Sequence, residues 1–142
     1  MSALRDVVET WFRRVWKEED TSAIDELFLP DGQARGLGAN VLIGPADFKQ
    51  FHAALCAQLS GIVITVDKSL EEGDWISVVC TLHAQRQDTG APVTMTGSVM
   101  VRIVDGKLVE AYNHWDFLTL YGQLGKLPTD TFEQALRGQK VI

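Results

Sequence analysis

The chain has 142 residues, a size typical of one domain with one hydrophobic core. Hydrophobic residues make up 46% and charged residues 23%, which excludes disordered and collagen-like chains. The net charge of −6 argues against a nucleic-acid partner, because binding to phosphates depends on clustered Lys and Arg. No stretch reaches the roughly 18 apolar residues of a membrane span, so no membrane partner is expected.

The first half of the chain is predicted to be mainly helical. Apolar residues recur with helical spacing over residues 4–16 and form one stripe. A short second helix is predicted over residues 23–29, where Pro30-Asp31-Gly32 stops it. The glycine-rich residues 33–43 indicate only a short strand and a loop. Pro45 opens a third predicted helix, which Ser60-Gly61 ends.

The second half is predicted to be a sheet, because the hydrophobic period changes from 3.6 to 2. Four strands are predicted, over residues 62–70, 75–85, 93–104 and 108–116. Short turns such as Asp105-Gly106 separate them, so consecutive hairpins should form an antiparallel sheet. A last helix is predicted over residues 117–124, and the tail is expected to add one further helical turn.

This order of elements predicts an α+β fold. We expect a curved antiparallel sheet wrapped on three or four helices into a cone with a central pocket. Residues 1–128 should form a single domain, with residues 129–142 as its tail. Cys56 and Cys80 lie in apolar segments and the first residues lack a signal-peptide core, so a cytoplasmic protein is expected.

Sequence motifs for a nucleotide, a metal or a nucleophile are not found. Gly36-Leu37-Gly38 lacks the third glycine of a dinucleotide-binding loop. His52, His83 and His114 lie on separate elements without zinc-site spacing, and His52 is expected at the surface or edge of its helix. We therefore expect no metal and no cofactor, and any chemistry should be acid–base chemistry.

The densest group of polar side chains ends the last predicted strand. Glu110, Tyr112, His114 and Asp116 share one face of this strand, because side chains alternate along it. If that face lines the pocket, an aspartate, an imidazole and a phenol converge where proton transfer is possible. In the alternative, Asp116 caps the following helix, and His114 and Tyr112 are packed, hydrogen-bonded residues.

Other residues are candidates for substrate binding. Phe12 and Trp16 of the first helix are expected in the core and on the apolar wall of the pocket. His83 is either a polar group of the pocket or an exposed residue, and Arg35 is the one cation expected near the pocket mouth. Tyr112 completes this set.

The last quarter of the chain carries a specific pattern. It reads Gly106-Lys107-Leu108-Val109-Glu110-Ala111-Tyr112, then Asp116, then Gln123-Leu124-Gly125-Lys126-Leu127-Pro128. This pattern resembles the carboxy-terminal signature of SnoaL-like polyketide cyclases, which belong to the nuclear transport factor 2-like (cystatin-like) superfamily of cone-shaped α+β folds. By this resemblance, Asp116 corresponds to the general acid/base of a cofactor-free aldol ring closure. Tyr112 stands where the family usually has Trp, and His114 occupies a position where aromatic residues are common.

The leading hypothesis is a cofactor-independent enzyme acting on a small hydrophobic carbonyl compound, with cyclase or isomerase chemistry. Asp116 would move the proton, and His114, Tyr112 or His83 would orient or polarise the oxygen. The main alternative is a binding module without chemistry. By resemblance to the superfamily, a homodimer is expected through the outer sheet face, with Val109, Ala111 and Trp115 as its apolar surface.

A second alternative is a hydrolase of the epoxide-hydrolase type, which would need a water held between Asp116 and another acid. Limonene-epoxide-hydrolase-like proteins pair an Asp and an Arg on one strand, and residues 93–103 offer only Arg102. Ketosteroid-isomerase-like proteins use an Asp base beside the first strand, and residues 33–38 contain no acid. Neither complete catalytic set is present in the sequence.

Overall fold

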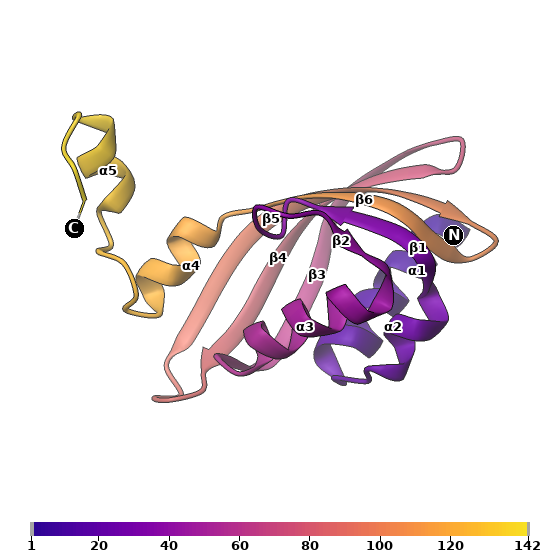
Figure 1. Cartoon of the computed structure of the whole chain (residues 1–142), viewed down its shortest axis with the longest axis horizontal. Helices are drawn as coiled ribbons and strands as arrows, with labels where there is room; N and C mark the ends of the chain where they lie inside the picture. Colours follow the sequence, from indigo (N-terminus) through magenta and orange to yellow (C-terminus); the bar gives the residue numbers. More distant parts are fainter. Residues whose placement is uncertain (1, 142) are drawn as a thin grey trace.

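The computed structural model describes residues 2–141 and shows an α+β fold, in which one six-stranded sheet arches over the helices of the first half of the chain, and the last two helices lie beyond its end (Figure 1). The strand order is β2-β1-β6-β5-β4-β3. The strands are β1 (Phe28–Arg35), β2 (Leu42–Ile43), β3 (Leu59–Glu72), β4 (Trp75–Arg86), β5 (Pro92–Val104) and β6 (Lys107–Trp115). The helices are α1 (Ala3–Trp11), which continues as the π-helical turn η1 (Phe12–Lys17), then α2 (Ser22–Leu27), α3 (Gly44–Cys56), α4 (Phe117–Gln123) and α5 (Thr131–Leu136). None of the helices within residues 2–141 has the length and apolar character needed to cross a membrane.

The predicted meander is confirmed, since β3, β4, β5 and β6 pair consecutively and antiparallel. The first strand differs from the prediction in two ways. It begins at Phe28, so α2 ends two residues earlier than predicted, because the Phe28 ring is buried in the core and its backbone pairs beside Leu108. It also runs parallel to β6, with Ala34 opposite Ala111, which makes the sheet mixed.

Aromatic packing joins the helices to the sheet. The predicted apolar stripe of the first helix is confirmed, and Trp11 and Trp16 are both buried. The Trp11 ring meets the Phe48 ring of α3 edge-on at 5.1 Å between centroids, and the Phe28 ring of β1 at 6.1 Å. Edge-to-face contacts of this kind add to the stabilisation from burial alone.

His52 corrects one expectation, because it is buried rather than placed at the surface. Only 3% of the residue is exposed, and it shares the core-facing side of α3 with Phe48 and Leu55. Its Nε2 lies 2.7 Å from the carbonyl oxygen of Val15. Carbonyls in the last turn of a helix lack helical partners, so His52 satisfies one at the end of η1. It is therefore a hydrogen-bonded core histidine.

Both cysteines are free thiols. Cys80 is fully buried, and Cys56 is half-buried beside His52. Burial, and secondarily the negative charge of Glu19, raises the pKa of Cys56 to about 12. Burial with a smaller effect of Asp67 raises the pKa of Cys80 to about 12 as well. Because the thiolate is the reactive form of cysteine, neither side chain is an activated nucleophile.

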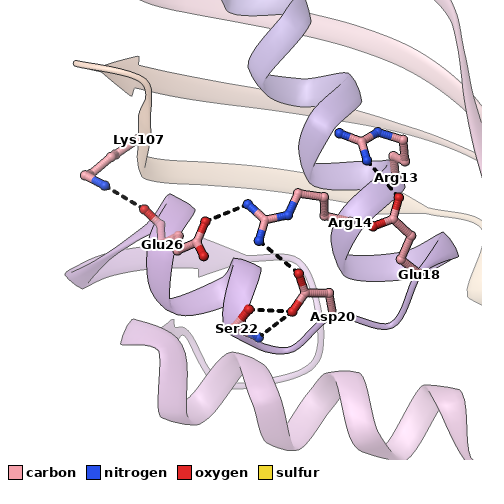
Figure 2. A network of polar contacts seen from close by, with 7 residues as sticks. All are labelled: Arg13, Arg14, Glu18, Asp20, Ser22, Glu26 and Lys107. Atoms are coloured by element: carbon pink, nitrogen blue, oxygen red, sulfur yellow. Dashed lines mark hydrogen bonds and ion pairs between the residues drawn. The ribbon is translucent and has the colours of Figure 1, made fainter.

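Arg14 organises the corner between η1 and α2 (Figure 2). Its guanidinium lies 2.9 Å from the Asp20 carboxylate and 2.6 Å from the Glu26 carboxylate. Hydrogen bonds from Ser22 and then Arg14 lower the pKa of Asp20, and the bond from Arg14 lowers the pKa of Glu26. Lys107 donates to the backbone carbonyl of Glu26 at 2.6 Å, so the same corner is tied to the start of β6.

Replacement of Arg14 by methionine should remove a pH-dependent part of the stability. Carboxylates with a lowered folded-state pKa stabilise the protein fully above their ordinary pKa near 4, and this stabilisation is lost as the pH falls through the lowered values. We therefore expect Arg14→Met to lower the Tm at pH 7, and the difference from the wild type to shrink from about pH 5 to about pH 3. Thermal unfolding followed by circular dichroism at each pH measures this.

Arg13→Met is the matched control, because Arg13 makes a single exposed ion pair with Glu18 on the same turn. Its Tm should stay close to that of the wild type across the series. A Tm difference for Arg14→Met that stays constant from pH 7 to pH 3 would contradict the role given to the carboxylates.

Candidate functional site

A cavity of about 60 Å³ lies between the concave face of the sheet and the helices. Its wall comes from α1, η1, α3, all the strands except β2, the start of α4, and Leu37 in the loop that follows β1. Aromatic rings form much of it: Trp11, Phe12, Trp16, Phe28, Phe48, Phe51, Trp115 and Phe117. Among the lining residues, Asn113 alone carries a polar side chain apart from the indole N–H groups. This composition suits an apolar ligand.

A β-bulge in β6 determines which of its side chains reach the cavity. Arg102 of β5 pairs with Glu110, but the next residue, Ile103, pairs with Leu108, so Val109 is the extra residue. Leu108 lines the cavity before the bulge. One extra residue reverses the alternation of side chains, so the odd-numbered residues line the cavity after it. These residues are Ala111, Asn113 and Trp115.

The bulge places the predicted polar face of β6 on the outside of the sheet. The Tyr112 hydroxyl donates to Glu110 at 3.2 Å, and its ring lies 6.3 Å from that of Trp75. His114 is exposed to solvent. Neither residue lines the cavity, so the expectation that they meet a ligand there is corrected.

The other predicted contacts divide into two groups. Phe12 and Trp16 line the cavity, as expected. His83 is exposed on the outer face of β4, where its Nδ1 lies 3.3 Å from the Thr94 hydroxyl. Arg35 is exposed and donates to Gln33 at 3.1 Å. Neither His83 nor Arg35 belongs to the cavity wall, because both point from their strands away from the core.

Asp116 is the N-cap of α4. Its carboxylate accepts the backbone N–H of Thr119 at 3.1 Å and the Thr119 hydroxyl at 2.6 Å. The residue is exposed and follows Trp115 and precedes Phe117, both of which line the cavity. The capping alternative is therefore observed. The capping residue stands in the sequence between two residues of the cavity wall.

The mouth of the cavity is marked by lining residues that are only half-buried: Leu37, Phe51, Ile64, Asn113, Trp115 and Phe117. The rings of Phe51 on α3 and Phe117 on α4 meet edge-on at 6.5 Å. This contact spans the two helices at the opening. Entry of a ring-sized ligand requires such side chains to move, because even a benzene-sized guest occupies a cavity of about 150 Å³.

Gln123 fixes α4 to the sheet and gives a physical role to one residue of the family-like signature. Its side-chain oxygen accepts the Thr94 N–H at 2.9 Å, and its nitrogen donates to the Thr94 carbonyl at 2.7 Å. Arg86 also donates to the Gln123 carbonyl at 3.2 Å. These bonds, with the Asp116 cap, hold both ends of the helix that carries Phe117.

Asn113 is the functional candidate that sequence reasoning missed. Its Nδ2 donates to the backbone carbonyl of Arg35 at 3.1 Å, which ties the end of β1 to β6. The only signal in the sequence was its place on the same strand face as Ala111 and Trp115. That face was expected to form an apolar surface for a dimer, and this expectation is corrected because Ala111 and Trp115 line the cavity.

The described part of the chain contains no group of three or more His, Cys, Asp or Glu side chains that could hold a metal ion. The cavity wall carries no ionisable side chain, since its residues are apolar, aromatic or, at Asn113, an amide. The arrangement can therefore surround an apolar molecule and offer it neutral hydrogen-bonding groups. Among the acidic residues of the described chain, Asp116 alone has a lining residue on both sides in sequence.

Comparisons with known proteins point to one family and one fold. The family model for SnoaL-like polyketide cyclase matches residues 6–124. A candidate SnoaL-like polyketide cyclase from Jannaschia sp. CCS1 is 18% identical, with a TM-score of 0.76 over 89% of this chain and 94% of that one. A protein with a ketosteroid isomerase-like fold from Catenulispora acidiphila, in complex with trimethylamine, is 19% identical, with a TM-score of 0.73 over 88% and 95%.

TerC co-crystallised with polyporic acid is 20% identical, with a TM-score of 0.72 over 87% of this chain and 99% of that one. No curated protein matches the chain. At these identities the solved structures establish the α+β fold, which agrees with the architecture expected from the sequence.

Proposed function

The chain belongs to the SnoaL-like polyketide cyclase family, and we propose that it binds a small, neutral, hydrophobic molecule in the cavity under the sheet. The observation that carries this proposal is the cavity wall, which is aromatic and aliphatic with one amide side chain. A charged ligand would lose its hydration there without gaining an opposite charge. Structural relatives crystallised with trimethylamine and with polyporic acid support small-molecule binding by this fold.

Toluene is a suitable first probe, because it matches the apolar wall and has no polar group. A ligand that binds only the folded state stabilises it by RT ln(1 + L/Kd) at a free ligand concentration L, so the Tm rises with ligand concentration. We expect saturating toluene to raise the Tm of the wild type, and to leave unchanged the Tm of Ala111→Leu, whose larger side chain fills the cavity. Differential scanning fluorimetry over a toluene series measures both.

Thr96→Leu is the matched control, since it adds a similar apolar side chain on the exposed outer face of β5. It should respond to toluene as the wild type does. A Tm of the wild type that does not respond to toluene, or an equal response in Ala111→Leu, would refute binding in the cavity.

A second candidate function is cofactor-independent acid–base chemistry on a small carbonyl compound, of the cyclase or isomerase type. Asp116 is the proton-transfer group in this candidate, and three features support it. The family is one of polyketide cyclases, the carboxylate is exposed, and it stands between two residues that line the cavity. The carboxylate would take a proton from the carbon next to the carbonyl and return it after rearrangement.

This candidate is weaker where it relied on His114, Tyr112 and His83, since these side chains lie away from the cavity wall. The hydrolase alternative has no second acid among the residues that line the cavity within residues 2–141. Asp116 therefore carries the enzymatic proposal alone.

Asp116→Asn separates catalysis from capping, because Asn caps a helix about as well as Asp but cannot accept a proton at pH 7. We expect this variant to keep the wild-type Tm and to lose at least about 100-fold of any rate enhancement. The assay is deuterium exchange next to the carbonyl of acetophenone in D₂O, followed by NMR. Asp116→Ala serves as the control for the cap, with an expected loss of about 1 kcal/mol.

Exchange that is equally fast with the wild type and Asp116→Asn would remove Asp116 from the mechanism. If the wild type exchanges acetophenone no faster than buffer alone, catalysis of this exchange is excluded and only the binding proposal stands.

We also propose a homodimer formed through the outer sheet face. Three exposed apolar side chains on that face support it: Val63 on β3 is 37% exposed, Val79 on β4 49% and Met100 on β5 45%. Analytical ultracentrifugation should show a dimer that Val79→Lys weakens at least about tenfold, because a buried lysine without a partner is costly. A monomeric wild type at 100 µM, roughly the scale of weak association, would refute the dimer.

A further inference from the structure

The orientation of the Asn113 amide follows from its neighbours. A backbone carbonyl only accepts hydrogen bonds, so the amide end that faces the Arg35 carbonyl at 3.1 Å is the nitrogen. Gly36 lies against the same residue with a φ of +86°, and a Cβ at Gly36 would clash with the Asn113 backbone carbonyl. The side chain of Asn113 is thus held by the last residue of β1, and its backbone lies against the residue that follows.

The other end of the amide, Oδ1, is left to act as an acceptor. Within residues 2–141 no hydrogen bond engages this oxygen, and no buried side-chain oxygen or nitrogen there lacks a partner. Together these observations mean that Oδ1 is accessible to solvent or to a ligand. An amide oxygen only accepts hydrogen bonds, so the group that it recognises must be a donor.

The surroundings of Asn113 restrict the rest of the ligand. It lies among the half-buried residues of the mouth, together with Leu37 and Trp115. No ionisable side chain lines the cavity, so a charged donor such as an ammonium group would be desolvated without compensation. The cavity of about 60 Å³ must already widen to admit a single ring, so a compact ring costs less rearrangement than a molecule with several fused rings.

We propose that Asn113 selects the ligand, and that the cavity prefers a compact neutral ring compound with a hydroxyl donor, such as a phenol or an enol. This inference rests on the proposed binding function, to which it adds the chemical class. Oδ1 accepts a hydrogen bond from the ligand hydroxyl at the mouth, while the ring packs against the aromatic wall. An enol is also the neutral tautomer of a carbonyl compound, so the preference is compatible with either candidate function.

The test compares phenol with toluene, which have similar shapes and differ in the hydroxyl group. Dissociation constants are measured by NMR titration of the tryptophan indole N–H signals, for the wild type and for Asn113→Leu. The ratio of the two constants in each protein is then compared, so that the different hydration of the two probes cancels. A neutral hydrogen bond predicts that the relative preference for phenol falls about 3- to 10-fold in Asn113→Leu.

Phe51→Leu is the control, because it changes the apolar wall without changing Asn113. It should shift the affinities for both probes by a similar factor and leave their ratio unchanged. If Asn113→Leu does not fold, phenol and anisole are compared on the wild type, since methylation removes the donor. Phenol should then bind at least about threefold more tightly than anisole.

The outcomes separate the two proposals. If both probes bind and the ratio is the same in the wild type and Asn113→Leu, or phenol is no tighter than anisole, the role of Asn113 is overturned and cavity binding stands. If neither probe binds to the wild type, the proposed function fails and the inference fails with it.

Discussion

The β-bulge at Val109 is the constraint from which the character of the cavity follows. Side chains alternate along a strand, so the extra residue after Leu108 reverses which of the following residues face the helices. Without it, Glu110, Tyr112 and His114 would lie toward the core, where all three polar side chains would need partners. With it, Ala111, Asn113 and Trp115 lie there instead. The cavity is apolar for this reason.

The helices complete the cavity by supplying aromatic side chains that hold one another. Trp11 and Phe48 meet edge-on, and His52 ties the end of η1 to α3 through the Val15 carbonyl. At the mouth, the Asp116 cap and the hydrogen bonds of Gln123 to Thr94 fix α4, so that Phe117 meets Phe51 there. The polar residues nearest the cavity thus act mainly by hydrogen bonds that hold the surrounding elements in place.

Because the polar residues hold the structure together and the cavity wall is apolar, ligand binding is better supported than catalysis. Family membership brings an expectation of acid–base chemistry, but the cavity wall of this chain offers no ionisable side chain. Asp116 is the one acidic candidate, and its carboxylate already accepts two hydrogen bonds from Thr119. In the proposed selection, the Asn113 amide distinguishes ligands by a hydrogen bond and transfers no proton.

The amino-acid sequence was sufficient to predict the α+β order, the antiparallel meander and the apolar stripe of the first helix, because these depend on local hydrophobic period and turn residues. It also determined that Phe12 and Trp16 contribute to the cavity wall. The sequence did not predict the parallel pairing of β1 with β6 or the burial of His52, since both depend on contacts between residues distant in the chain. The face of β6 that lines the cavity also follows from the folded structure. It depends on the bulge at Val109, which arises from pairing with β5, and no local pattern in β6 reveals this shift of one residue.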